Sequence, residues 1–131
     1  MIIINWNCQG LGNQRAVEVL TKLVRSKGPT ILFLMETKRT IAEMRNLCHD
    51  LNFHSVLTVP CEGRKGGLVM FWKADCNLHI QTFSPNHIDT HILSANQQPW
   101  RLTGLYGRLE GYCKHELWLL LRHLHARSSL L

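Results

Sequence analysis

Two side chains in the first third of the chain have the chemistry to bind a divalent cation. Asn7 follows the apolar run of residues 2–4, and Glu36 ends a second apolar run, Ile31 to Met35. One helix-sized segment joins the runs, so we expect two buried strands with neighbouring carboxyl ends, the place where α/β folds bind ligands. Amide and carboxylate oxygens suit Mg²⁺, and Asn7 with Glu36 is a candidate metal site. Each residue alone also fits an ordinary role, Asn7 in a turn and Glu36 as a solvated charge before a helix.

The elements that would position these residues have clear signals. Residues 13–27 carry apolar side chains at helical spacing, with Asn13 as a cap and Gly28-Pro29 as a stop. Residues 30–35 are apolar on both faces, which predicts a central buried strand. Thr40 and Glu43 form a capping box for a helix that ends near Asn52, with Cys48 on its buried face.

From Phe53 onward the sequence changes to short β-type segments. They are residues 55–59, 68–72, 78–83, 87–93 and 100–106. The first two flank the basic loop of residues 60–67 and predict a hairpin, and the later ones predict an antiparallel meander. The chain shows no internal repeat and no linker, so we expect residues 1–131 to form one α/β domain.

The charge balance favours a polyanionic partner. Fifteen Lys and Arg residues against nine Asp and Glu residues give a formal net charge of +6 and a pI near 9.4. Such a surface suits DNA, although an excess of positive charge also serves solubility.

The cysteines and the hydropathy pattern indicate a compartment. Five widely spaced cysteines without a C-x-x-C pair argue against structural zinc, a disulfide framework and a disulfide-linked partner. No segment resembles a signal peptide or a membrane span. We therefore expect an intracellular protein, nuclear or cytoplasmic, without a membrane partner.

Four separated motifs resemble a known family. WNCQGLGN, LMETK, GGLVMFWK and WRLTGLYG, the last followed by KHELW, occur in this order. They resemble the endonuclease/exonuclease/phosphatase superfamily, and in particular the amino-terminal part of the endonuclease domain of plant LINE-type (non-LTR) retrotransposons. The resemblance covers residue 1 to about residue 124.

The resemblance implies a fold and a reaction. The fold would be a partial four-layer α/β sandwich whose carboxyl-terminal half is missing. The reaction would be phosphodiester hydrolysis in DNA with Mg²⁺, or Mn²⁺ as the alternative, bound by Asn7 and the catalytic Glu36. Tyr106 matches a family tyrosine that contacts the scissile phosphate. The later family motifs, G-D-x-N and an Asp-His pair, do not occur before Leu131, so we expect little or no activity and marginal stability, with the missing half as a potential partner.

Three basic residues are candidate nucleic-acid contacts. Arg64 and Lys65 lie in the loop of residues 60–67, where a solvated turn is the alternative. Lys114 stands where the family has an arginine, and it lacks the bidentate guanidinium fork. His87, Asp89 and His91 alternate along a β-type segment, which predicts a polar sheet face rather than a metal site.

Two other functions remain open at this stage. The chain could be a basic nucleic-acid-binding remnant without catalysis, or a fragment of a phosphoinositide or phospholipid phosphoesterase of the same fold. Retention on DNA without metal-dependent nicking would identify the first, and the sequence has no amphipathic membrane segment that would favour the second.

Overall fold

The structure, a computed structural model, describes residues 1–60, 66–107, 119, 122–123 and 125. The chain divides into two compact units, Met1–Asn77 and Leu78–Leu131. Each unit is described by itself.

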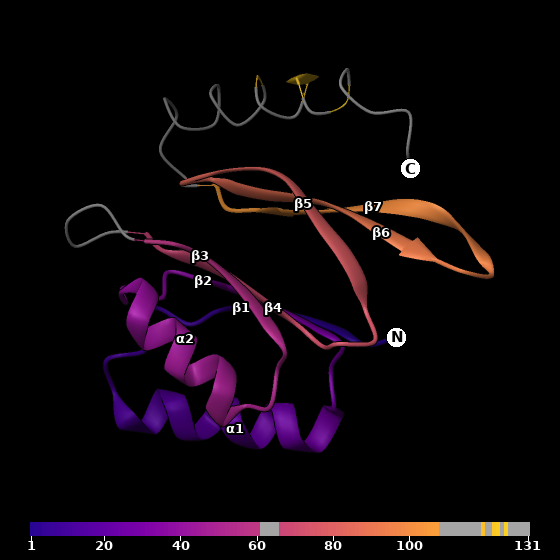
Figure 1. The fold of residues 1–131 in the computed structure, drawn as a ribbon. Helices are drawn as coiled ribbons and strands as arrows, with labels where there is room; N and C mark the ends of the chain where they lie inside the picture. The colour runs from indigo at the N-terminus through magenta and orange to yellow at the C-terminus, as the bar shows by residue number, and fades with distance from the viewer. Residues whose placement is uncertain (61–65, 108–118, 120–121, 124, 126–131) are drawn as a thin grey trace. The chain divides into compact units, whose positions relative to one another are not determined.

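The first unit is a four-stranded sheet with two helices on one of its faces (Figure 1). Its elements are β1 (Ile3–Asn7), α1 (Gln14–Lys27), β2 (Ile31–Met35), α2 (Ile41–Asp50), β3 (Ser55–Val59) and β4 (Leu68–Trp72). The strand order is β1-β2-β4-β3; β1 is parallel to β2, and β4 is antiparallel to both of its neighbours. The core contains Leu32 and Leu34 of β2 and Val69 and Phe71 of β4, packed with Leu20, Val24, Met44, Leu47 and Cys48 of the helices.

Both helices begin where the capping residues predict. The Asn13 side chain accepts a hydrogen bond from Arg15 N at 2.9 Å, and Gly28 at φ 56° donates to Val24 O at 2.8 Å. Thr40 and Glu43 form the predicted capping box of α2, which ends at Asp50, two residues before the predicted end. Local side-chain chemistry therefore fixes the helix starts.

One expectation about β1 is wrong. β1 is not a buried strand: it lies at the edge of the described sheet, and Ile3 keeps 39% of its surface exposed. It also continues through Asn7 instead of ending before it. An isoleucine run indicates a strand, but burial depends on the number of neighbouring strands, and β1 pairs only with β2 among the described strands. The prediction for β2 is confirmed, because it lies between β1 and β4 and residues 31–34 are buried.

The β-type segments form strands where the sequence predicts them, except that the last strand begins at Gln97, three residues before the predicted start, and ends at Leu105. In the first unit β3 and β4 pair as an antiparallel hairpin, with Val59 opposite Leu68. The second sheet contains β5 (Asn77–Ser84), β6 (His87–Ser94) and β7 (Gln97–Leu105) in sequential order, and all of it from Leu78 onward belongs to the second unit. β6 and β7 are antiparallel from His87↔Leu105 to Ser94↔Gln97, with an irregularity between Ile92 and Ser94. The meander is therefore confirmed.

The cysteines behave as core residues where the structure describes them. Cys8, Cys48 and Cys76 are free and buried, and burial raises the pKa of each thiol. In the described part of the chain no helix has the length and apolar character of a membrane span.

Candidate functional site

Three backbone segments lie side by side at one end of the strands of the first sheet. Asn7 is the last residue of β1 and pairs with Met35, the last residue of β2, so Glu36 leaves the neighbouring strand one residue later. Leu68, the first residue of β4, pairs with Met35 from the other side. The segments after β1, after β2 and before β4 therefore lie side by side, as the sequence predicts for the first two.

Hydrogen bonds tie these three segments together beyond the strand ends. Residues 36–38 are the central segment. On one side it accepts bonds from Gly10 N to Glu36 O (2.6 Å) and Leu11 N to Thr37 O (3.1 Å), next to the bond of Cys8 N to Met35 O (3.1 Å) at the end of β2. On the other side it donates from Thr37 N to Gly67 O (3.2 Å) and from Lys38 N to Gly66 O (3.3 Å). Paired backbone groups hold a loop in one conformation, so the backbone at the strand ends that carry Asn7 and Glu36 is preformed within this unit.

The same segments contain unusual backbone conformations. Gln9, Glu36 and Lys38 have positive φ angles of 50°, 55° and 54°. Residues with side chains rarely adopt such angles, and they persist where surrounding interactions enforce them, often at functional sites. Here the hydrogen bonds between the segments supply that enforcement.

Gly67 allows β4 to approach the central segment closely. Its φ is +96°, and a Cβ atom there would lie 2.5 Å from Thr37 Oγ1 and 3.1 Å from Lys38 N. Only glycine satisfies both the angle and the contact. The sequence marks Gly66-Gly67 as a turn, but it gives no sign of this close approach.

The oxygen atoms of the Asn7 and Glu36 side chains are of the kind that Mg²⁺ takes as part of its ligand set. Asn7 Oδ1 accepts a hydrogen bond from Gln9 N at 3.2 Å, and a carbonyl oxygen keeps a second lone pair for a cation. Glu36 adds a carboxylate from the next strand. The described residues contain no cluster of three or more His, Cys, Asp or Glu side chains with metal-binding geometry. Two oxygen ligands suit Mg²⁺, which retains waters and binds substrate phosphates, better than an ion that needs a full protein cage.

Cys8 lies beside the candidate ligands but is not one of them. Its Sγ donates to Met35 O at 3.1 Å. Burial raises the pKa of the thiol, backbone hydrogen bonds lower it in part, and the negative charge of Glu36 raises it further. A metal requires the thiolate, so the buried Cys8 is a packing residue.

Thr37 and Arg39 also belong to the site, and sequence reasoning missed both. The Thr37 hydroxyl is fully buried and has no hydrogen-bond partner in the described part of the chain. Arg39 Nη2 donates to Leu11 O at 2.7 Å, and its Nη1 forms an ion pair with Glu43 of α2. Arg39 therefore anchors the segment after β1 to the start of α2. The bond of Arg39 to Leu11 joins residues 28 positions apart, a separation that local patterns do not report.

The remaining predicted site residues lie elsewhere in the chain. Tyr106 belongs to the second unit, directly follows β7, is buried, and donates its backbone N–H to Asn86 O at 2.8 Å. Its phosphate contact stays a prediction. Arg64, Lys65 and Lys114 lie outside the described residues.

The second unit has a buried polar cluster. Asp89 is 3% exposed; its Oδ1 accepts from Arg101 Nε at 2.8 Å and from Thr103 Oγ1 at 2.7 Å, and its Oδ2 accepts from Arg101 Nη2 at 3.1 Å. Burial would raise the pKa of Asp89, but these partners outweigh it and the pKa is lowered. Burial lowers the pKa of His87, whose ring bonds the hydroxyls of Thr82 and Ser84 at 2.9 and 2.5 Å. The carboxylate is already engaged on both oxygens, so this cluster is a structural network.

Comparison with known proteins identifies the fold. No protein-family model matches the chain, and no curated protein matches it in sequence. Solved structures do match it: the AP endonuclease of Leishmania major has a TM-score of 0.66 at 16% identity over 87% of this chain. The AP endonuclease of Archaeoglobus fulgidus has 0.64 at 15% identity over 96%, and the human Nocturnin catalytic domain has 0.62 at 12% identity over 95%.

The chain spans about half the length of these structures, namely 43%, 50% and 58% of them. Identities this low establish the fold alone. The mixed α/β architecture with two sheets is the one that the sequence predicts. The chain therefore has a partial endonuclease/exonuclease/phosphatase fold.

Proposed function

We propose that this chain is the amino-terminal half of a Mg²⁺-dependent phosphodiesterase that nicks DNA, of the retrotransposon endonuclease type. The observation that carries the proposal is the hydrogen bonding between the segments that follow β1 and β2. Gly10 N donates to Glu36 O at 2.6 Å and keeps the loops that bear Asn7 and Glu36 side by side. The motif order, the positive charge and the fold support it.

Each candidate residue has a distinct role in this proposal. Asn7 and Glu36 would hold Mg²⁺, which when bound polarises a phosphate and stabilises a leaving oxygen. The Tyr106 hydroxyl would donate to a non-bridging phosphate oxygen as negative charge develops. Activation of water needs further groups that act together with these, and catalytic groups that act as a unit lose most of their effect when one is absent. We therefore expect metal binding with little or no hydrolysis.

Metal binding is tested by paramagnetic NMR with Mn²⁺ in place of Mg²⁺. We expect selective broadening of the Cys8, Gly10 and Thr37 amide signals, lost in Glu36→Gln. Glu18→Gln, which removes an exposed carboxylate from α1, is the matched control and keeps the broadening. Equal broadening in the parent and Glu36→Gln would rule out the site.

Catalysis is tested separately by nicking of supercoiled plasmid with Mg²⁺. The parent chain and Glu36→Ala should both give little or no nicked product. Nicking by the parent that disappears in Glu36→Ala would show that this half of the fold is a sufficient nuclease, against our expectation.

The net charge of +6 favours a second candidate, a nucleic-acid-binding remnant without catalysis. Retention on DNA would then weaken steeply with salt, because cations released from the DNA drive binding. Retention that is unchanged by EDTA and by Glu36→Gln would support this candidate over the metal-dependent one.

A further inference from the structure

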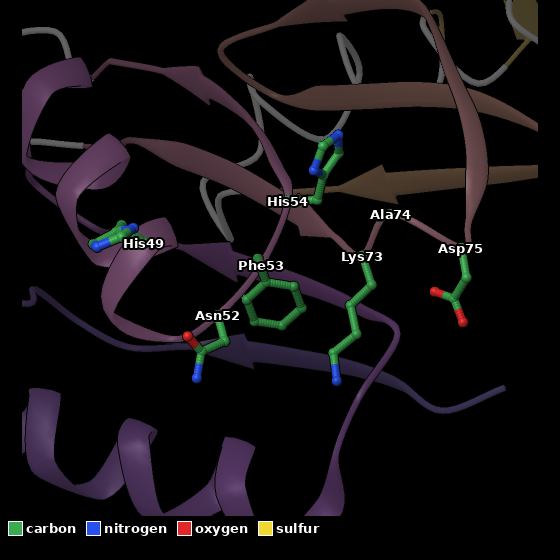
Figure 2. Close-up of a pocket in the computed structure, with 7 residues that line it drawn as sticks. All are labelled: His49, Asn52, Phe53, His54, Lys73, Ala74 and Asp75. Atoms are coloured by element: carbon green, nitrogen blue, oxygen red, sulfur yellow. The ribbon is translucent and has the colours of Figure 1, made fainter.

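A pocket of about 550 Å³ lies in the first unit at the end of the strands opposite to Asn7 and Glu36. β4 runs from Leu68, beside Met35, to Trp72, beside Ile31. The rise over these residues separates the two ends of the strands by roughly 13 Å. Figure 2 shows the pocket, which is lined by His49, residues 52–54 and residues 73–75. It is therefore distinct from the candidate metal site.

The walls of the pocket are held in place by the core. The Phe53 ring stacks on Phe71 with centroids 5.6 Å apart. The backbone on either side is fixed, because His54 N donates to Trp72 O and Lys73 N donates to Thr30 O, each at 3.1 Å. A preformed wall lowers the entropic cost of binding a ligand.

The centre of the pocket presents hydrogen-bond donors. The Lys73 ammonium lies 6.0 Å from the centroid of the Phe53 ring, a cation–π contact that restrains the long side chain. In Figure 2 Asn52, Phe53 and Lys73 extend in the same direction, with the ring between the amide and the ammonium, while His54 points the opposite way and His49 lies apart on α2. An ammonium offers three donors and no acceptor, and a carboxamide adds two donors. This set is suited to an oxyanion.

Two features could oppose an anion, and the structure limits the first. The carboxyl end of α2 lies here, but the carbonyls of its last turn are occupied by Leu51 N to Leu47 O (2.9 Å), Phe53 N to Cys48 O (3.0 Å) and Asn52 N to His49 O (3.1 Å). The second feature is the exposed carboxylate of Asp75. It lies on the other side of Lys73 from Asn52 (Figure 2). Removal of the Asp75 charge therefore makes a useful test of the sign of the ligand.

We propose that this pocket binds a phosphate group, with Lys73 and Asn52 as the donors. The phosphate could belong to a small molecule or to the backbone of a nucleic acid. The proposal does not depend on metal binding at Asn7 and Glu36, since the two sites lie at opposite ends of the strands.

The test is an NMR titration without divalent metal, first with inorganic phosphate and then with a short DNA duplex. We expect saturable shifts of the Phe53, His54 and Lys73 amides. Lys73→Gln should weaken phosphate binding about tenfold, the effect of one charge-assisted hydrogen bond. Lys22→Gln removes the same charge from an exposed position on α1 and should change little, whereas Asp75→Asn should tighten binding.

The outcomes are distinct because the same spectra report whether each variant is folded. Non-saturable shifts, or equal losses of affinity in Lys73→Gln and Lys22→Gln, would overturn the proposal. Weaker binding by Asp75→Asn would also contradict it, since the pocket would then favour a cation. Tighter binding of the duplex than of inorganic phosphate would identify the nucleic-acid backbone as the source, and the reverse order would identify a small molecule.

Discussion

Replacement of Gly67 by alanine should destabilise the first unit through two separable effects. A residue with a side chain at φ +96° is strained by about 1–2 kcal/mol. The new Cβ would also lie 2.5 Å from the buried Thr37 Oγ1, and displacement of a packed neighbour costs about 1–3 kcal/mol more. The free energy of unfolding should therefore fall by about 2–5 kcal/mol, a large part of a small domain's stability.

Gly66 supplies the matched control for this substitution. Its φ is +87°, but a Cβ there would meet nothing within 4 Å, so Gly66→Ala should show the strain of about 1–2 kcal/mol without the clash. Urea unfolding followed by tryptophan fluorescence measures the difference, and hydrogen exchange of the Thr37 and Lys38 amides locates it. Thr37→Ala in the Gly67→Ala background should recover part of the loss. A Gly67→Ala variant as stable as Gly66→Ala would refute the close packing inferred here.

Two further predictions concern the buried polar cluster of the second unit. Arg101→Met should lower the free energy of unfolding by about 3–5 kcal/mol, because the buried Asp89 carboxylate loses its charged partner and keeps only the Thr103 hydroxyl. The double variant Asp89→Leu/Arg101→Met should recover most of that loss in urea unfolding, and a double variant no more stable than Arg101→Met would contradict this. Burial lowers the pKa of His87 below its ordinary 6.5, so the unfolded chain binds more protons than the folded one below about pH 6.5 and stability should decrease as the pH falls from there. His87→Gln should flatten this part of the stability profile, and an unchanged slope would assign it to other groups.

The sequence predicts what depends on near neighbours along the chain. Asn13 and the Thr40–Glu43 capping box locate the helix starts because each satisfies backbone groups within three residues. The β3–β4 hairpin follows from two apolar segments around a glycine-containing loop. The Asn7 and Glu36 strand ends are adjacent because a crossover helix makes β1 and β2 parallel.

Other features depend on contacts between distant residues, and no local pattern contains them. The edge position of β1 is set by which strands pair with it, so its isoleucines could not report their own exposure. The contact of Gly67 with Thr37 depends on the register of β2 and β4. The ion pair of Asp89 with Arg101 depends on the register of β6 and β7, although alternation along β6 predicts that Asp89 lies on a polar face.

The proposed metal binding and the proposed hydrolysis have different structural requirements. The segments that carry Asn7 and Glu36 are joined by backbone hydrogen bonds that lie wholly within the first unit. The arrangement of these two segments therefore requires only the first unit to fold. Hydrolysis requires a phosphate contact and a group that activates water, and in-line attack needs all of them at once. Under the proposed function we therefore expect a chain that binds Mn²⁺ through Glu36 and yet leaves plasmid intact. Loss of Mn²⁺ binding on disruption of the Gly67–Thr37 contact would show that the hydrogen-bonded strand ends hold the ligands in place.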